Sequence, residues 1–168
     1  AALELKRYSS TVKMWRNMGG LVGLAGMADG KSTSFTNCTN NGTLKYSDTT
    51  GKTAADLGGI VGTYTGKKAT VTFDNCSNYG NLTIDEAATT RDCNIGGIVS
   101  VIDSSKDQSD ANNKKNVTFK NNTIISGNIY ANGAVVNALR IGGIIGYSNT
   151  FNTVEINGPV TKSGSITV

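Results

Sequence analysis

Histidine is missing from this sequence of 168 residues, and proline, cysteine and aromatic residues are scarce. Histidine is the commonest metal ligand and the usual base at neutral pH, so its absence excludes sites built on it. Charged residues make up only 17% of the chain and the net charge is +4, which is too little to indicate a nucleic-acid partner. No apolar run approaches the ~20 residues of a membrane-spanning helix. We therefore expect no nucleic-acid binding and no membrane span in this segment.

Processing signals are also missing. Ala1 opens directly into polar sequence without a signal peptide, so we expect a mature product or a piece excised from a longer chain. The three cysteines, Cys38, Cys76 and Cys93, form no CxxC pair, and their number does not define a redox compartment. The number of Asn-x-Ser/Thr sequons is close to chance for such an Asn- and Thr-rich chain, so they do not demonstrate glycosylation.

The chain is instead built from repeats. A Gly-Gly-aliphatic motif occurs four times, at spacings of 39, 38 and 46 residues, beginning at Gly19, Gly58, Gly96 and Gly142. A second block follows each motif and contains Phe-x-Asn, then Gly-x-Leu or Gly-x-Ile; the Phe position holds Phe35, Phe73, Phe119 and, in the last copy, Ile156. Self-similarity at this period is typical of a solenoid, a propeller or an array.

The local pattern selects among these architectures. Each repeat holds three short β-type runs, such as Ile60-Val61, residues 70–73 and residues 81–84, separated by turn-forming residues. No long stretch has helical periodicity, and the Trp-Asp signature of a propeller blade is missing. We therefore predict an all-β fold: a single-stack, right-handed parallel β-helix of about four coils. Its expected organisation is 1–18 as a cap or incomplete first coil and 19–168 as four repeats, at 19–57, 58–95, 96–141 and 142–168.

Stacking of equivalent residues predicts columns along the axis, because neighbouring coils lie ~4.8 Å apart. The three phenylalanines are expected to stack in the core, and Asn37, Asn75 and Asn121 to form an amide ladder at a corner. The glycines suit corners that need positive φ or close approach of coils. Cys38 and Cys76 fall in one column, either as buried free thiols or as a disulfide whose in-register geometry is unfavourable.

The repeat resembles the GLUG-type repeat of large bacterial secreted and surface proteins. The resemblance rests on Gly-Gly-Ile-Val-Gly followed by Asn-Cys-x-Asn-x-Gly-x-Leu and covers residues 19 to 168. Copies one and two match it well, whereas copy three has Ser100 for the final Gly and Asn122 for the Cys. The resemblance implies an extracellular β-helical spacer or adhesive module. It implies no catalytic residues, because the motif residues are structural.

Several segments outside the motifs are candidates for other roles. Residues 1–7 are expected to form a short helix that caps the open end of the solenoid. Residues 11–15 alternate like a strand, which favours part of an incomplete first coil for this second half of the segment. The insertion at 103–116 projects from one face; its three aspartates lack calcium-loop spacing and indicate a solvated loop. Lys67-Lys68 and Lys114-Lys115 are expected in solvated turns. Four tyrosines either stack on sugar rings or cover the coil edges: Tyr46, Tyr64, Tyr79 and Tyr147.

A catalytic site is not expected. β-Helices host polysaccharide-cleaving enzymes, but such sites need convergent carboxylates or a base beside a metal. Asp74, Asp85 and Glu86 are the nearest approach to an acidic cluster, and we expect them on the surface. Ice binding needs Thr-x-Thr at one position in successive coils, and Thr70-Val71-Thr72 is not repeated in copies one and three.

We therefore expect a non-catalytic, extracellular or cell-surface module that acts as a stalk, an adhesin, or a segment binding glycans or host proteins. It is expected to use no cofactor and no metal, and the sequence does not identify its binding residues. The first alternative is a self-assembling filament subunit joined through the β-helix ends. The second alternative is a polysaccharide-degrading β-helix enzyme.

Overall fold

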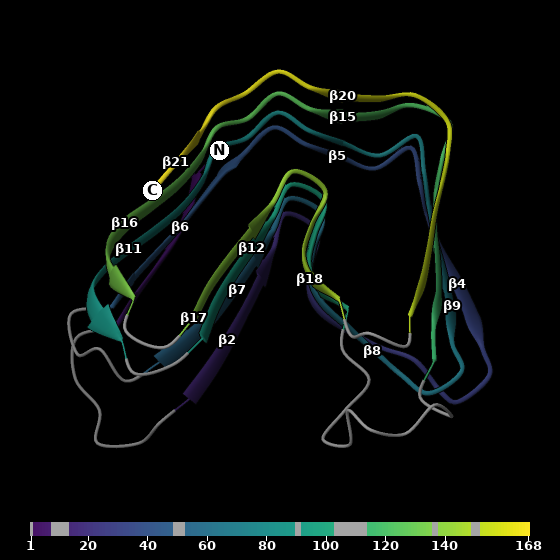
Figure 1. Ribbon diagram of the computed structural model, residues 1–168, viewed down its shortest axis with the longest axis horizontal. Coiled ribbons are helices and arrows are strands. Elements are labelled where there is room, and N and C mark those ends of the chain that lie inside the picture. The colour runs from purple at the N-terminus through teal and green to yellow at the C-terminus, as the bar shows by residue number, and fades with distance from the viewer. Residues whose placement is uncertain are drawn as a thin grey trace.

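The protein is a stack of parallel β-strands (Figure 1). The computed structural model describes residues 2–7, 14–48, 53–89, 92–102, 114–135, 138–148 and 152–168. Within these ranges every regular element is a strand and every strand pair is parallel, which confirms the prediction of an all-β fold, a β-helix of about four coils. No helix in these ranges is long and apolar enough to cross a membrane.

The strands fall into four coils preceded by one extra strand, β1 (Ala2–Arg7). Coil 1 contains β2 (Met14–Gly19), β3 (Val22–Gly26), β4 (Ser32–Thr36), β5 (Thr39–Asn40) and β6 (Thr43–Asp48). Coil 2 contains β7 (Thr53–Gly58), β8 (Val61–Thr65), β9 (Thr70–Asp74), β10 (Ser77–Asn78) and β11 (Leu82–Thr89). Coil 3 contains β12 (Asp92–Gly96), β13 (Val99–Ile102), β14 (Asn116–Lys120), β15 (Thr123–Ile125) and β16 (Ile129–Val135). Coil 4 contains β17 (Ala138–Gly142), β18 (Ile145–Ser148), β19 (Thr153–Asn157), β20 (Val160–Lys162) and β21 (Ile166–Thr167).

Equivalent strands form five sheets that run the length of the stack. Sheet A has the order β1-β6-β11-β16-β21. The other four sheets have four strands each: β2-β7-β12-β17 in sheet B, β3-β8-β13-β18 in sheet C, β4-β9-β14-β19 in sheet D and β5-β10-β15-β20 in sheet E. Viewed along the stack, sheets A and B form one arm, sheets C and D the other, and sheet E joins the two arms (Figure 1). Each coil therefore has five strands rather than the three that we expected. The strand before each Gly-Gly motif and the short strand of sheet E, two or three residues long, were not predicted.

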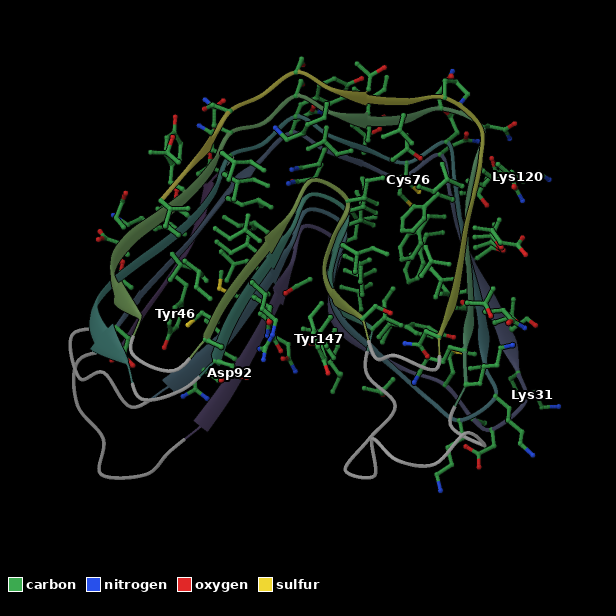
Figure 2. All side chains as sticks on the ribbon, viewed as in Figure 1. Lys31, Tyr46, Cys76, Asp92, Lys120 and Tyr147 are labelled. Carbon is green, nitrogen blue, oxygen red and sulfur yellow. The ribbon has the colours of Figure 1, made fainter. Side chains whose placement is uncertain are left out.

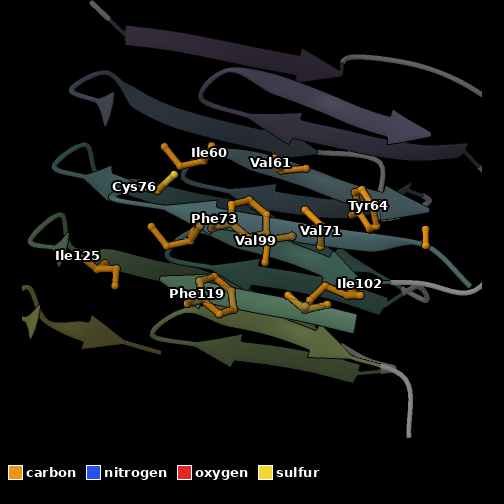
Figure 3. Close-up of a cluster of buried hydrophobic side chains, with 13 residues drawn as sticks. Ile60, Val61, Tyr64, Val71, Phe73, Cys76, Val99, Ile102, Phe119 and Ile125 are labelled. Carbon is orange, nitrogen blue, oxygen red and sulfur yellow. The ribbon is translucent and has the colours of Figure 1, made fainter. Parts of the chain in front are cut away.

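Each arm encloses its own hydrophobic core. The core between sheets C and D contains Tyr64, Val71, Phe73 and Phe119 (Figure 3), and the core of the other arm contains Tyr46, Leu57, Ile84 and Ile95. The predicted aromatic column is confirmed: ring centroids lie 5.2 Å apart for Phe35–Phe73 and 5.1 Å apart for Phe73–Phe119, with nearly parallel planes. Stacked aromatic residues therefore tie three coils together in one arm.

The motif glycines allow close approach rather than positive φ. A Cβ on Gly58 would lie 1.7 Å from the Val61 carbonyl oxygen, and one on Gly59 would lie 2.0 Å from that of Gly97 in the next coil and 2.5 Å from Asn78 Cγ. The turn between sheets B and C therefore packs against sheet E with no room for a side chain. None of the described motif glycines has positive φ, so that part of the expectation is wrong.

Left-handed backbone recurs instead at the corner between sheets D and E. Asn37, Asn75 and Asn121 have φ of 53°, 53° and 57° there, and Lys68 and Gly30 also have positive φ outside this corner. Asparagine tolerates this region because its short side chain bonds locally. Asn75 Nδ2 donates to Asn37 Oδ1 at 2.8 Å, but Asn121 Nδ2 donates to Asp74 Oδ1. The predicted ladder is therefore confirmed between coils 1 and 2 and wrong for coil 3.

Residues 2–7 are a strand, so the helical alternative for this segment is wrong. β1 pairs with β6 from Ala2↔Thr43 to Arg7↔Asp48, which places it in sheet A as the strand preceding coil 1. Residues 11–13 and most of the insertion at 103–116 lie outside the described residues.

Candidate functional site

Exposed large apolar side chains are concentrated at the two ends of the stack. Among the described residues, Leu21 and Leu24 lie in coil 1, and Tyr79 is the one example in coils 2 and 3. The remaining five lie in coil 4: Val154, Ile156, Val160, Ile166 and Val168. The side of the stack is thus largely free of large apolar groups, whereas the fourth coil offers a set of them.

Two of the side chains in coil 4 continue core columns that are buried in coils 2 and 3. Ile156 continues the column of Phe73 and Phe119, which are 0% and 1% exposed, yet Ile156 is 53% exposed. Val154 continues the column of Val71 and Val117, both fully buried. Strands β17 to β20 each have one neighbour in their sheet, so each presents one backbone edge. We call the residues of β17–β21 with Val168 the coil 4 face.

A polar seam lies where the outward faces of sheets B and C meet at the centre of the stack. The Asp56 side chain accepts a hydrogen bond from Asn94 Nδ2 at 2.7 Å. The Thr63 hydroxyl lies 3.1 Å from Asp56 Oδ2 and 3.0 Å from Asn17 Oδ1, so its single proton serves one of them at a time. Asp56 and Asn94 are each 3% exposed, which makes these bonds costly to remove.

Ser100 also belongs to this seam. It occupies the position held by glycine in the other copies, and its hydroxyl donates to the Asn94 carbonyl oxygen at 2.8 Å. In coil 2 a Cβ on the equivalent Gly62 would lie 2.4 Å from the Gly23 carbonyl oxygen. The departure from the repeat in copy three therefore adds a hydrogen bond between sheets B and C.

The seam ends in coil 4 with a charged and aromatic group. Arg140 Nη1 lies 2.7 Å from Asp92 Oδ2 and 3.4 Å from Asn94 Oδ1, and its guanidinium carbon lies 4.8 Å from the centre of the Tyr147 ring. Tyr147 points into the space between the two arms (Figure 2). Its ring and the Arg140 side chain, which is 37% exposed, extend the polar surface up to the coil 4 face.

Sequence reasoning missed this seam although a signal was present. The residue two places before each Gly-Gly pair is polar in every copy: Asn17, Asp56, Asn94 and Arg140. These four residues are in register in sheet B. A polar residue at one fixed position beside buried apolar neighbours indicates a column on the opposite face of the sheet.

Asp74 and Asp85, which are the nearest approach to an acidic pair in the sequence, lie in different sheets. Asp74 ends β9 in sheet D and accepts a hydrogen bond from Asn121, whereas Asp85 is in sheet A and forms an exposed ion pair with Lys45 at 3.2 Å. The side chain of Glu86 and the three aspartates of the insertion lie outside the described side chains. Within the described part of the chain, no group of three or more Cys, Asp or Glu side chains could hold a metal ion.

The remaining candidates divide between surface and core. Lys67, Lys68 and Lys114 are exposed as expected, but Lys115 is fully buried, so the solvated assignment is wrong for it. Tyr46 and Tyr64 are also fully buried in the two cores. They therefore neither present a ring for sugar stacking nor cover a coil edge. Tyr79 is 46% exposed and is left as the tyrosine best placed for a surface contact.

The three cysteines are free thiols. Cys76 is buried in the core of sheets C and D, and Cys93 in the other core. Burial raises the pKa of Cys76 from 9.0 to about 11, although hydrogen bonding with the backbone of Cys38 and Asp74 acts to lower it. Cys38 is half-buried on coil 1, in the column of Cys76. The structure thus agrees with free thiols rather than with a Cys38–Cys76 disulfide.

Comparison with protein-family models, with curated proteins and with solved structures finds no match to this chain.

Proposed function

We propose that this chain is a non-catalytic module of the cell surface or extracellular space, in which a rigid β-helical stack acts as a stalk or adhesive segment. The supporting observation is that the residues repeated in each copy hold neighbouring coils together. The Gly-Gly pairs, the phenylalanine column and the asparagine rungs all make contacts between coils. In a repeat protein, such nearest-neighbour contacts let length grow with repeat number. The resemblance to GLUG-type repeats supports the same proposal.

Adhesion to glycans or to host proteins is the binding activity that we assign to this module. Among the residues that the structure describes, Tyr79 is the exposed aromatic side chain, and its ring offers an apolar face with a polar tip. A glycan array and intact cells, probed with the purified chain, test the proposal directly. We expect Tyr79→Ala to reduce binding severalfold, whereas Lys120→Ala, an exposed change in sheet D, leaves it intact.

Three results would contradict the adhesive proposal. The first is no binding to glycans or cells at any concentration. The second is equal loss of binding in the Tyr79 and Lys120 variants, which would remove the role of the aromatic ring. The third is a fall in polysaccharide chain length during incubation, which would identify an enzyme instead.

A second candidate function is self-association through the ends of the stack, and the coil 4 face favours it. The exposed Ile156 and Val154 continue columns that are buried in coils 2 and 3. Adding a further coil would bury them and pair the edges of β17 to β20. Size-exclusion chromatography with light scattering is expected to show a mass that rises with concentration; a constant monomer mass up to millimolar concentration would refute this candidate.

A further inference from the structure

We propose that Cys38 and Cys76 are a redox pair and that a small-molecule disulfide, such as glutathione disulfide, oxidises them to a covalent bond between coils 1 and 2. The free thiols described above are the reduced state of this pair. The inference goes beyond the proposed function, because it assigns a chemical modification to the stack. Cys93 lies in the other core and takes no part.

The two cysteines occupy the same place, the corner between sheets D and E, in consecutive coils. Each follows an asparagine with left-handed backbone, Asn37 or Asn75, and each directly precedes a strand of sheet E. On one side of the pair, Asn75 Nδ2 donates to Asn37 Oδ1 at 2.8 Å. On the other side, the Ser77 N–H donates to the Cys38 carbonyl oxygen at 2.8 Å. Hydrogen bonds between the coils therefore hold the two cysteines one ladder step apart.

The side chains bring the two sulfur atoms to the same part of coil 1. Cys76 lies in the core of sheets C and D (Figure 3), and its Sγ lies 3.2 Å from the carbonyl oxygen of Phe35 in the preceding coil. Cys38 packs against the same core, and its Sγ lies 3.6 Å from the carbonyl oxygen of Thr36, the next residue after Phe35. Burial is the main cause of the raised pKa of Cys76, and the charge and hydrogen bonding of the Cys38 side chain raise it further, so the two thiols lie within interaction distance.

The corner can also supply the movement that a disulfide needs. Cβ atoms in register on neighbouring strands of a regular parallel ladder lie ~4.8 Å apart, whereas a disulfide needs about 3.5–4.5 Å. Cys38 lies between β4 and β5, and Cys76 lies between β9 and β10, so neither is part of a strand. A shift of about 1 Å at this corner therefore brings the pair into range while the flanking strands keep their register.

The oxidation proceeds by two thiol–disulfide exchanges. Cys38 reacts first because it is half-buried, whereas Cys76 is 0% exposed. The Cys38 thiolate attacks one sulfur of the small disulfide, whose S–S bond breaks, and the departing thiolate takes up the proton that Cys38 lost. The Cys76 thiolate then attacks Cys38 Sγ and displaces the second small thiolate, which takes up the proton of Cys76. Two cysteine thiols are oxidised, and one small disulfide is reduced to two thiols.

The bond would add a covalent link to one coil boundary of the stack. Coils 3 and 4 have no cysteine at this corner, so the link is confined to coils 1 and 2. A cross-link that closes a loop of one whole coil restricts the unfolded chain. We therefore expect oxidation to raise Tm by roughly 5 °C.

Mass spectrometry of the Cys93→Ala variant tests the proposal, because the proposed pair holds the only thiols of this variant. The variant is incubated with glutathione disulfide at about pH 9, where more of the Cys76 thiol is ionised than at neutral pH. We expect the loss of two hydrogen atoms from the chain, no alkylation of either cysteine by iodoacetamide after unfolding, and the rise in Tm. Dithiothreitol is expected to reverse all three changes.

Serine variants separate the two roles. In the Cys93→Ala background, Cys76→Ser is expected to stop at a stable glutathione adduct on Cys38, and Cys38→Ser to react at least roughly tenfold more slowly. Peptide mapping of the unsubstituted chain gives a readout without any variant, and we expect Cys38 linked to Cys76 and Cys93 free. A persistent adduct on Cys38 in the chain that retains Cys76, a disulfide between two chains, or two unreacted thiols would each overturn the proposal.

Discussion

Phe73 is the residue whose replacement tests the stacked core most directly. Its ring is 0% exposed and is stacked between Phe35 and Phe119, at 5.2 and 5.1 Å. Replacing a buried phenylalanine by alanine costs about 3–5 kcal/mol, and the loss of two aromatic contacts lies toward the upper part of that range. We therefore expect Phe73→Ala to lower the free energy of unfolding by about 4 kcal/mol.

The same column provides a matched control. Ile156 is 53% exposed, so Ile156→Ala gives up only about half of the 2–5 kcal/mol of a buried site, about 1–2 kcal/mol. Urea denaturation followed by circular dichroism measures both variants against the parent chain. Equal losses of unfolding free energy in the two variants would refute the reasoning, because they would show that the burial of a column position does not determine its contribution to stability. A loss below about 2 kcal/mol for Phe73→Ala would contradict its central role.

Three further predictions concern other parts of the stack. Gly59→Ala is expected to be among the most destabilising single changes, because its Cβ would lie 2.0 Å from the Gly97 carbonyl oxygen; thermal denaturation measures this, and an unchanged Tm would refute it. Asp56→Ala leaves the buried Asn94 amide without its 2.7 Å acceptor and is expected to cost about 1–3 kcal/mol in urea denaturation, with Asp56→Asn milder; no loss in Asp56→Ala would show that water replaces the carboxylate. Because its pKa is raised to about 11, Cys76 stays a neutral thiol at pH 8, so we expect alkylation by iodoacetamide to be slow in the native protein, to accelerate as pH rises toward 11, and to be fast after unfolding; rapid native labelling at pH 8 would contradict this.

The sequence predicted those features that repeat at a constant spacing. The phenylalanine column and the asparagine rung between coils 1 and 2 follow from residue identity at one position in each copy. The ladder failed at Asn121 because Asp74, which precedes the Asn75 corner, offers a carboxylate oxygen within reach. A charged acceptor forms a stronger hydrogen bond than an amide does, and the repeat alone does not reveal that competition.

The shape of each coil was less predictable. Residues 54–58 and 92–96 lie in strands although they contain Ala, Asp, Asn and Gly, which are poor strand formers. Their pairing with the same segment of neighbouring coils overrides this local preference. The burial of Tyr46, Tyr64 and Lys115 was missed for a related reason. In a coil with two arms, positions near a turn can still face a core.

Only part of the candidate site could be predicted from the sequence. The polar residue two places before each Gly-Gly pair could be recognised in the sequence. Its place in the polar seam could not, because the seam depends on sheets B and C meeting through their outward faces. The sequence placed Ile156 in the last copy, but it did not show how far the side chains of that copy are exposed. Exposure at an end is a property of the stack and not of the residue.

The direction of the interstrand hydrogen bonds has a mechanical consequence. These bonds run along the stack, and β1 and β21 lie at opposite edges of sheet A. Tension applied between these two strands therefore pulls each bond along its own length and opens the ladders one after another, as in unzipping. Each coil of about 38 residues would release roughly 130 Å of extended chain. A stack with this geometry therefore lengthens coil by coil when it is pulled along its axis.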